Sequence, residues 1–234
     1  MTRQARIPSP NKASVLERLT AHVPISAVVD VGVRDCTMEL IEAFPGLKHY
    51  LFEPVTLFFD SIKANYRHIE YELMPVALSD LDSQFYLVLS SLGNDGVVTH
   101  SRIVVSPVPV DGLTVVSCST VQVRRFDSLF RDREIPKNHF LKVDVDGKDL
   151  EVVRGFGDRL AEASAVVVEC TFFTYLDRAA YLTSRGFSLV DIVDIIYYGE
   201  SIYRFDAVFV RKDLVTSELR PSIDNFRHEI WYRM

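Results

Sequence analysis

Short apolar runs alternate with amphipathic segments along most of the chain. The first run, 25–31, is apolar on both faces, which is typical of a strand covered by helices on both sides. The segment after it ends at Pro45-Gly46, a helix-stop signal. The same pattern predicts strands at 25–31, 49–52, 70–78, 139–145, 165–169, 188–196 and 206–211, and helices at 14–22, 36–44, 55–66, 126–131, 148–156 and 175–185. Strands alternating with helices indicate a doubly wound, mostly parallel α/β sheet with right-handed crossovers.

The regular alternation is interrupted between 83 and 123. A strong hairpin signal, Asp111-Gly112, lies inside this region. Its β-rich segments are 84–89, 103–110 and 115–123, and 90–101 is expected to be a flexible loop. We interpret 83–123 as a β-rich insertion beside the sheet, and such insertions often cover a binding site as a lid.

The length of 234 residues fits one α/β domain with a small insertion. Its ends are expected to be a loose arm at 1–11 and a tail at 212–234. The aromatic stretch 226–232 in this tail packs either on the domain or on a second chain, so a homodimer is possible.

Charge and cysteine content exclude several classes of protein. The net charge of −6, with no run of Lys and Arg, argues against a nucleic-acid partner. The three cysteines lie far apart and fit neither a disulfide framework nor a zinc site, which favours a reducing compartment. The N-terminus lacks the apolar core of a signal peptide, and no apolar run approaches the ~20 residues of a membrane span. These features predict a cytoplasmic protein.

Two acidic residues near strand ends carry the first chemical signal. Asp30-Val-Gly32 ends the first apolar run, and Glu53 ends the next one about 20 residues later. In nucleoside-binding units the backbone turns at such a glycine and the carboxylate accepts hydrogen bonds from ribose hydroxyls. The loop after Gly32 lacks the further glycines that let backbone approach a pyrophosphate, which favours S-adenosylmethionine as the ligand. The alternative for Asp30 and Gly32 is an ordinary strand-to-helix turn.

Two other polar residues are candidates for contact with the same ligand. The guanidinium of Arg34 pairs either with the carboxylate of the cofactor or with Asp35 in a surface salt bridge. Asp80, at the end of the predicted strand 70–78, either reaches an adenine amino group or starts a turn.

The densest polar signal is the alternation of Lys142, Asp144 and Asp146 with apolar residues. In a strand all three side chains leave the same face, at the sheet edge where open sheets bind ligands. Asp144 then acts as a general base on a substrate hydroxyl or orients it. In one alternative Asp144 and Asp146 hold Mg²⁺ together with further oxygen ligands, and in another Lys142 forms a structural ion pair with these acids. Glu169, at the end of the next strand, either positions substrate or is an exposed strand-end glutamate.

One long motif is especially specific: it runs from Phe140 to Gly155 and reads Phe-Leu-Lys-Val-Asp-Val-Asp-Gly-Lys-Asp-Leu-Glu-Val-Val-Arg-Gly. With the shorter motifs Val28-Val-Asp-Val-Gly32 and Phe52-Glu-Pro54, it resembles the FkbM-type S-adenosylmethionine-dependent methyltransferases. The others, in matching order and spacing, are Val76-Ala-Leu-Ser-Asp80, Ser90-Ser-Leu92 and Phe126-Asp-Ser-Leu129. The chain departs from the family pattern at Cys36, where a second glycine is usual, and at Asp146, where Glu is usual.

The resemblance implies a class I methyltransferase domain with a seven-stranded sheet whose last strand is antiparallel. Members characteristically methylate hydroxyls on sugars and natural products. By the same resemblance Asp144 lies at the reaction centre, and the residues that line the cofactor are Asp30, Gly32, Glu53, Ser79 and Asp80.

The sequence therefore predicts an enzyme that transfers a methyl group from S-adenosylmethionine to a hydroxyl of a small acceptor. Two alternatives remain open at this point. One is a relative that has lost catalysis and serves as a binding module, which the altered loop at Arg34 and Cys36 motivates. The other is a metal-dependent nucleotide-sugar enzyme with Asp144-Val-Asp146 at its metal site.

Overall fold

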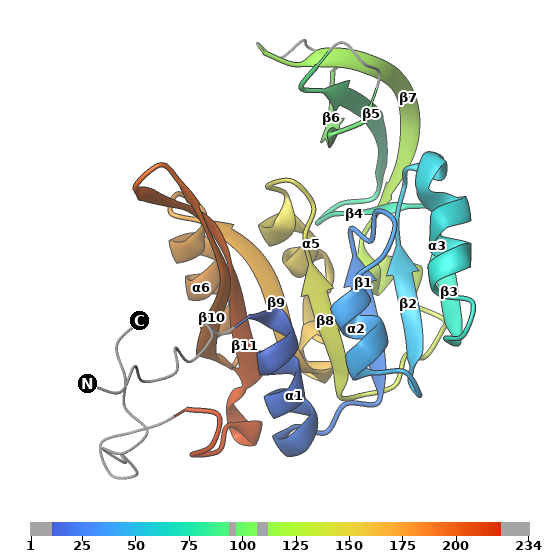
Figure 1. Cartoon of the computed structure of the whole chain (residues 1–234). Coiled ribbons are helices and arrows are strands. Elements are labelled where there is room, and N and C mark those ends of the chain that lie inside the picture. Colours follow the sequence, from blue (N-terminus) through green and yellow to red (C-terminus); the bar gives the residue numbers. More distant parts are fainter. Residues whose placement is uncertain (1–10, 94–96, 107–111, 221–234) are drawn as a thin grey trace.

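The computed structural model describes residues 11–93, 97–106 and 112–220, which form two β-sheets with helices (Figure 1). The larger sheet has seven strands, all parallel except β11, which is antiparallel to both of its neighbours. In spatial order they are β10 (Phe187–Tyr198), β11 (Ser201–Arg211), β9 (Ala163–Thr171), β8 (His139–Val143), β1 (Ala27–Val31), β2 (Lys48–Phe52) and β3 (Tyr71–Met74). The predicted mostly parallel α/β sheet with an antiparallel last strand is confirmed.

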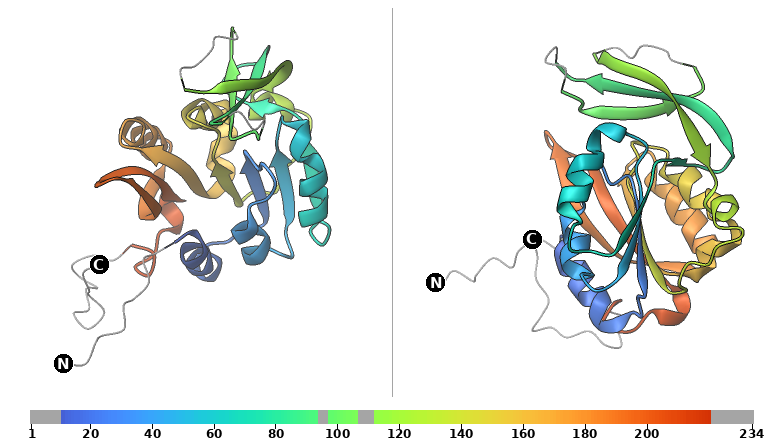
Figure 2. Two further views of the ribbon diagram at one scale, coloured as in Figure 1. Left: turned by 45° about the horizontal axis from the view of Figure 1, so that its top comes forward. Right: turned by 90° about the vertical axis from the view of Figure 1, so that its right-hand side faces the viewer.

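Helices cover both faces of this sheet (Figure 2). Consecutive residues of a strand point to opposite sides, so strands that are apolar throughout need a cover on each face. In β1, Val28 packs with Leu16 and Leu40 on one face, whereas Val29 packs with Phe126 on the other. The first face carries α1 (Lys12–His22), α2 (Met38–Ala43), the 3₁₀ turn η1 (Thr56–Phe58) and α3 (Phe59–Asn65). The second carries α4 (Phe126–Leu129), α5 (Asp149–Gly155), the 3₁₀ helix η2 (Gly157–Glu162) and α6 (Tyr175–Ser184).

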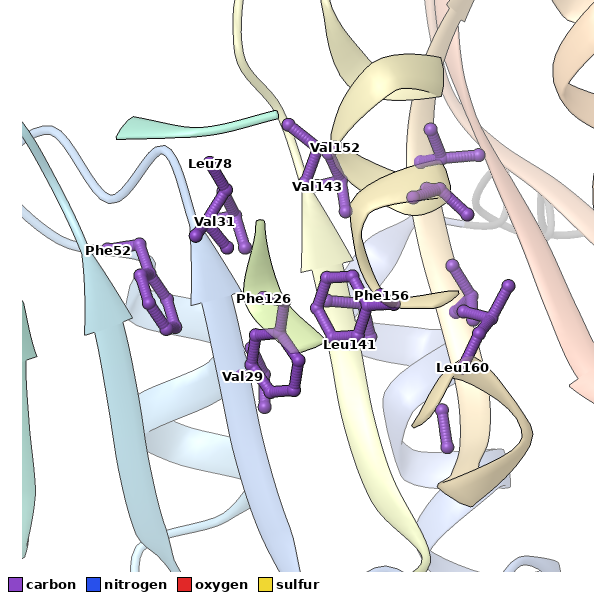
Figure 3. Close-up of a cluster of buried hydrophobic side chains, with 14 of the residues drawn as sticks. Val29, Val31, Phe52, Leu78, Phe126, Leu141, Val143, Val152, Phe156 and Leu160 are labelled. Carbon is purple, nitrogen blue, oxygen red and sulfur yellow. The ribbon is translucent and has the colours of Figure 1, made fainter. Parts of the chain in front are cut away.

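The core of the second face is centred on aromatic side chains (Figure 3). The rings of Phe126 and Phe156 stack with centroids 3.9 Å apart, and Phe130 stacks on Phe126 at 4.6 Å. All three side chains are fully buried. A helix as short as α4 has little stability of its own, so this packing holds it in place.

The second sheet has four strands and lies beyond the carboxyl ends of the first (Figure 1). Its order is β4 (Ala77–Leu78), β7 (Thr114–Arg124), β5 (Ser83–Ser91) and β6 (His100–Val104). The prediction of one strand over 70–78 is therefore wrong, since β3 ends at Met74 and Ala77–Leu78 pairs with β7. Pro75 lies at the break, and proline has no N–H to continue the ladder.

Several other predicted boundaries shift by a few residues. The predicted helix 55–66 begins as a 3₁₀ turn, and the predicted strand 206–211 starts earlier, at Ser201, as half of a long hairpin with β10. Of the strand predicted at 103–110, residues 103–104 belong to β6 (His100–Val104), residues 105–106 are not strand, and 107–110 lie outside the described residues. After β11 the chain continues into a 3₁₀ turn, η3 (Lys212–Leu214).

Some predictions fall outside the described residues. These are most of the loose arm, the centre of the loop 90–101, residue Asp111 of the hairpin signal, and the aromatic stretch 226–232. Within residues 11–93, 97–106 and 112–220, no helix is long and apolar enough to cross a membrane.

Candidate functional site

The candidate site lies where the strand order reverses, between β1 and β8. The chain proceeds from β1 to β2 on one side, whereas β8 flanks β1 on the other, and the loops after these strands meet at one edge. Gly32 allows their close approach. Its φ is +81°, and a Cβ there would lie 1.9 Å from the carbonyl oxygen of Asp144. This glycine is therefore required by packing within the protein, besides any role toward a ligand.

Glu53 lies directly after β2 and is almost fully buried. Its Oε2 accepts the backbone N–H of Arg34 at 2.8 Å, and its Oε1 accepts that of Val55 at 2.8 Å. Burial raises the pKa of this carboxyl to about 7, although the two hydrogen bonds oppose the shift. Each carboxylate oxygen has a second lone pair, so Glu53 retains capacity to accept a hydrogen bond from a ligand.

Asp30 forms a buried ion pair beneath this edge. Lys142 Nζ lies 3.2 Å from Asp30 Oδ1 and donates to the carbonyl of Gly32 at 3.0 Å. The Tyr66 hydroxyl donates to Asp30 Oδ2 at 3.4 Å. Burial alone would lower the pKa of Lys142, but the carboxylates of Asp30 and Asp144 raise it above its usual value. Asp30 has no exposed surface. Its ion pair with Lys142 keeps the ammonium group against the carbonyl of Gly32, where the loop begins.

Asp144 is the partly exposed acid of the group. It follows the last residue of β8, its backbone N–H donates to Val31 at 3.0 Å, and its Oδ2 lies 3.6 Å from Lys142 Nζ. Its side chain is 39% exposed, so it can meet a ligand.

The prediction that Asp146 leaves the same strand face as Lys142 and Asp144 is wrong. The strand ends at Val143, and Asp146 and Gly147 both have positive φ in the turn that follows. Asp146 is exposed and accepts the Ser101 backbone N–H from β6 at 3.3 Å. Among the described residues no three His, Cys, Asp or Glu side chains gather as metal ligands, so the Mg²⁺ hypothesis has no support.

Glu169 is not the exposed strand-end residue that one alternative predicted, since β9 continues to Thr171. Its side chain is only 15% exposed, and its Oε1 lies 2.7 Å from the Arg204 guanidinium of β11. Burial, together with the nearby Asp144 carboxylate, raises the pKa of Glu169 to about 7. In register with it on β11 is Asp206, which pairs with Lys12 at 2.8 Å.

Arg34 lies at the mouth of the site with an exposed side chain. Its φ is +56°, its Nε is 3.8 Å from Asp35 Oδ1, and its guanidinium lies over the ring of Phe58 at 5.8 Å. The loose contact with Asp35 is the salt bridge considered from the sequence. In this conformation the backbone of Arg34, rather than its side chain, binds Glu53.

Ser79 and Asp80 follow β4, whose last residue, Leu78, belongs to the same buried cluster as Val31 and Phe52. The Ser79 N–H donates to Arg124 at 2.9 Å, and the Asp80 carbonyl accepts from the Arg125 guanidinium at 2.9 Å. The Ser79 carbonyl packs against α5, where a Cβ on Gly155 would lie 2.0 Å away. Among the hydrogen bonds formed by described residues, none joins Ser79 or Asp80 to Glu53 or Asp144.

The sequence reasoning missed a buried ion pair behind the site. Asp149 Oδ1 accepts the Val145 N–H at 3.1 Å, and its Oδ2 lies 2.6 Å from Arg178 Nη2. Arg178 also donates to the backbone carbonyl of Glu169. The pair thus ties the turn after Asp144 to the strand that carries Glu169. An acid in the first turn of a helix was visible in the sequence, but its partner on another helix was not.

Three comparisons relate the chain to known proteins. A family model described as the methyltransferase FkbM domain matches residues 21–194. A hexuronic acid methyltransferase, AglP of Haloferax volcanii, is 36% identical over 67 residues, which span 27% of this chain and 28% of that protein.

Two solved structures are similar in fold at low identity. Precorrin-6y C5,15-methyltransferase of Geobacter metallireducens is 13% identical, with a TM-score of 0.45 over 88% of this chain and 93% of that one. A putative tRNA (m1A22) methyltransferase of Streptococcus pneumoniae, in complex with S-adenosyl-L-methionine, is 15% identical. Its TM-score is 0.41 over 88% of this chain and 76% of that one.

Proposed function

Because the chain belongs to the methyltransferase FkbM domain family, we propose that it transfers a methyl group from S-adenosylmethionine to a hydroxyl oxygen of a sugar or natural-product acceptor. The observation that carries this proposal is the buried Glu53 carboxylate beside the Gly32 loop, with Asp144 directly after β8 and Glu169 on β9, the next strand. The partial likeness to a hexuronic acid methyltransferase supports the sugar class of acceptor.

The donor set fits the nucleoside part of this cofactor. A ribose diol needs a hydrogen-bond acceptor, and both oxygens of Glu53 are fixed by the backbone of Arg34 and Val55 while each keeps a free lone pair. Bound S-adenosylmethionine supplies an electrophilic methyl group. Arg34, at the mouth of the loop, is placed to pair with the carboxylate of the methionine part. Asp30 acts indirectly, by holding Lys142 against the Gly32 carbonyl.

The acceptor must lose its hydroxyl proton as the carbon–oxygen bond forms. Asp144 is the partly exposed carboxylate at the switch point, and we assign it the role of accepting that proton or orienting the hydroxyl. Glu169, held by Arg204, positions the acceptor. Bound S-adenosylmethionine would give up its methyl group and leave as S-adenosylhomocysteine, and as general base Asp144 would hold the proton lost by the hydroxyl.

Calorimetric titration with S-adenosylmethionine and S-adenosylhomocysteine is the first test. Micromolar binding is expected, and Glu53→Ala should weaken it about 10- to 100-fold, the loss expected for hydrogen bonds to a charged group. Equal affinity of Glu53→Ala would remove the ribose assignment. Failure of the wild type to bind either compound at millimolar concentration would refute the enzyme and favour a binding module with an altered Arg34–Cys36 loop.

A further inference from the structure

Large apolar side chains are exposed around the end of β9, beside Glu169. Phe173 is 95% exposed and Tyr198 is 82% exposed, which is unusual for aromatic side chains that have no function at the surface. We define the aromatic rim as Phe172, Phe173, Leu176, Tyr197, Tyr198 and Tyr203. Its members come from the β9–α6 connection, the start of α6, and the β10–β11 hairpin, which rises past the end of β9 (Figure 1).

The aromatic rim is continuous with the candidate site. Thr171, the last residue of β9, pairs in register with Arg204, whose guanidinium binds Glu169. Tyr203 is the next residue along β11, and its ring lies 6.3 Å from that of Tyr198. The rim therefore begins directly beyond the Glu169–Arg204 pair. It lies on the side of the site opposite to Glu53, because β9 and β2 are on opposite sides of the central strands β8 and β1.

The charges around the rim limit what can bind there. Exposed Asp177 and Glu200 flank it, and the nearby Arg204 guanidinium is paired with Glu169. This acidic surrounding disfavours an anionic membrane and an anionic sugar. It suits a neutral molecule with apolar faces and a hydroxyl edge, because rings can stack on the faces while carboxylates accept from the hydroxyls.

We propose that the aromatic rim is the acceptor subsite and that it takes a neutral sugar ring. The inference rests on the proposed function, since it assumes that the hydroxyl to be methylated meets Asp144. The ring stacks on Phe172, Phe173 or Tyr203, and a hydroxyl of the same ring donates to Glu169, which fixes the orientation of the sugar.

Direct binding can be measured without turnover. Neutral methyl hexopyranosides, with S-adenosylhomocysteine present, should receive saturation transfer from aromatic protons in NMR, strongest at the ring C–H protons. Phe173→Ser and Tyr203→Ser should reduce this signal, while Tyr86→Ser, an exposed tyrosine on β5 of the second sheet, serves as the matched control. A stronger signal from the matching hexuronates would overturn the neutral class of acceptor.

Kinetics then separate this inference from the proposed function. With the best hexopyranoside, each rim variant should raise the acceptor KM about tenfold, as expected for one aromatic contact, with kcat and the Kd of S-adenosylhomocysteine unchanged. Transfer that is equally efficient in the rim variants overturns the subsite but leaves the proposed function intact. If the wild type forms dimers or binds vesicles and the rim variants do not, while their acceptor KM is unchanged, the rim serves self-association or a membrane. That result also overturns the acceptor subsite.

Discussion

Replacing Gly32 with alanine tests whether the end of β1 must touch the end of β8. The φ of +81° is unfavourable for any residue with a Cβ and costs about 1–2 kcal/mol. The new Cβ would lie 1.9 Å from the carbonyl oxygen of Asp144, so backbone must move, at a further cost of about 1–3 kcal/mol. The expected loss is about 2–5 kcal/mol, a large share of a typical stability of about 5–15 kcal/mol.

Two other glycines separate these contributions. Gly186 has a φ of +91° with open space around its position, so Gly186→Ala should lose only the conformational part, about 1–2 kcal/mol. Gly46 has neither a positive φ nor a neighbour within 4 Å, and Gly46→Ala should be neutral or slightly stabilising. Urea denaturation followed by circular dichroism gives the free energy of unfolding of each variant. If Gly32→Ala is no less stable than Gly186→Ala, the close approach to Asp144 is not a rigid constraint and the reasoning fails.

Three further predictions concern the acids of the site. Burial raises the pKa of Glu53 from 4.5 to about 7, so between these pH values the folded protein holds a proton that the unfolded chain has released. The free energy of unfolding of the wild type should therefore fall by about 3 kcal/mol from pH 4.5 to about 7, relative to that of Glu53→Gln. Parallel pH profiles of the two proteins would contradict this. Asp144→Asn should slow methyl transfer at least about 100-fold with the affinity for S-adenosylhomocysteine and the unfolding midpoint nearly unchanged, and unchanged turnover would end its assignment to the chemistry. Asp149→Leu or Arg178→Met alone should lower the free energy of unfolding by about 3–5 kcal/mol, because each leaves a buried charge unpaired, and the double variant should recover most of this loss. Additive losses in urea denaturation would argue against the pair.

Apolar periodicity located the strands of the large sheet, although not all of their bounds, since it is a local property of each segment. The strand at 25–31 and the acids after neighbouring strands follow from composition and spacing, and parallel strands bring their carboxyl ends to one edge. The division of the predicted strand 70–78 was also visible in principle. Pro75 marks it, because a proline inside an apolar run removes a ladder donor.

The tertiary structure decided the environment of each acid. Glu53 and Glu169 both follow apolar runs, yet Glu53 is bound by two backbone N–H groups and Glu169 by Arg204, a residue distant in sequence. Asp144 and Asp146 look equivalent in an alternating pattern, but the left-handed turn at Asp146 sends the second acid to the N–H of Ser101. Such partners depend on where the chain turns and which strands pair.

The sequence alone therefore determined the class of fold and the edge of the sheet at which the acidic residues gather. Only the tertiary structure decided which acids are buried, which are paired and which face outward. The physical reason is that burial of apolar faces is encoded residue by residue, whereas a charge takes its partner from segments that packing brings together. The pairing of Lys142 with Asp30 and the position of the aromatic rim beside Glu169 are both products of that packing.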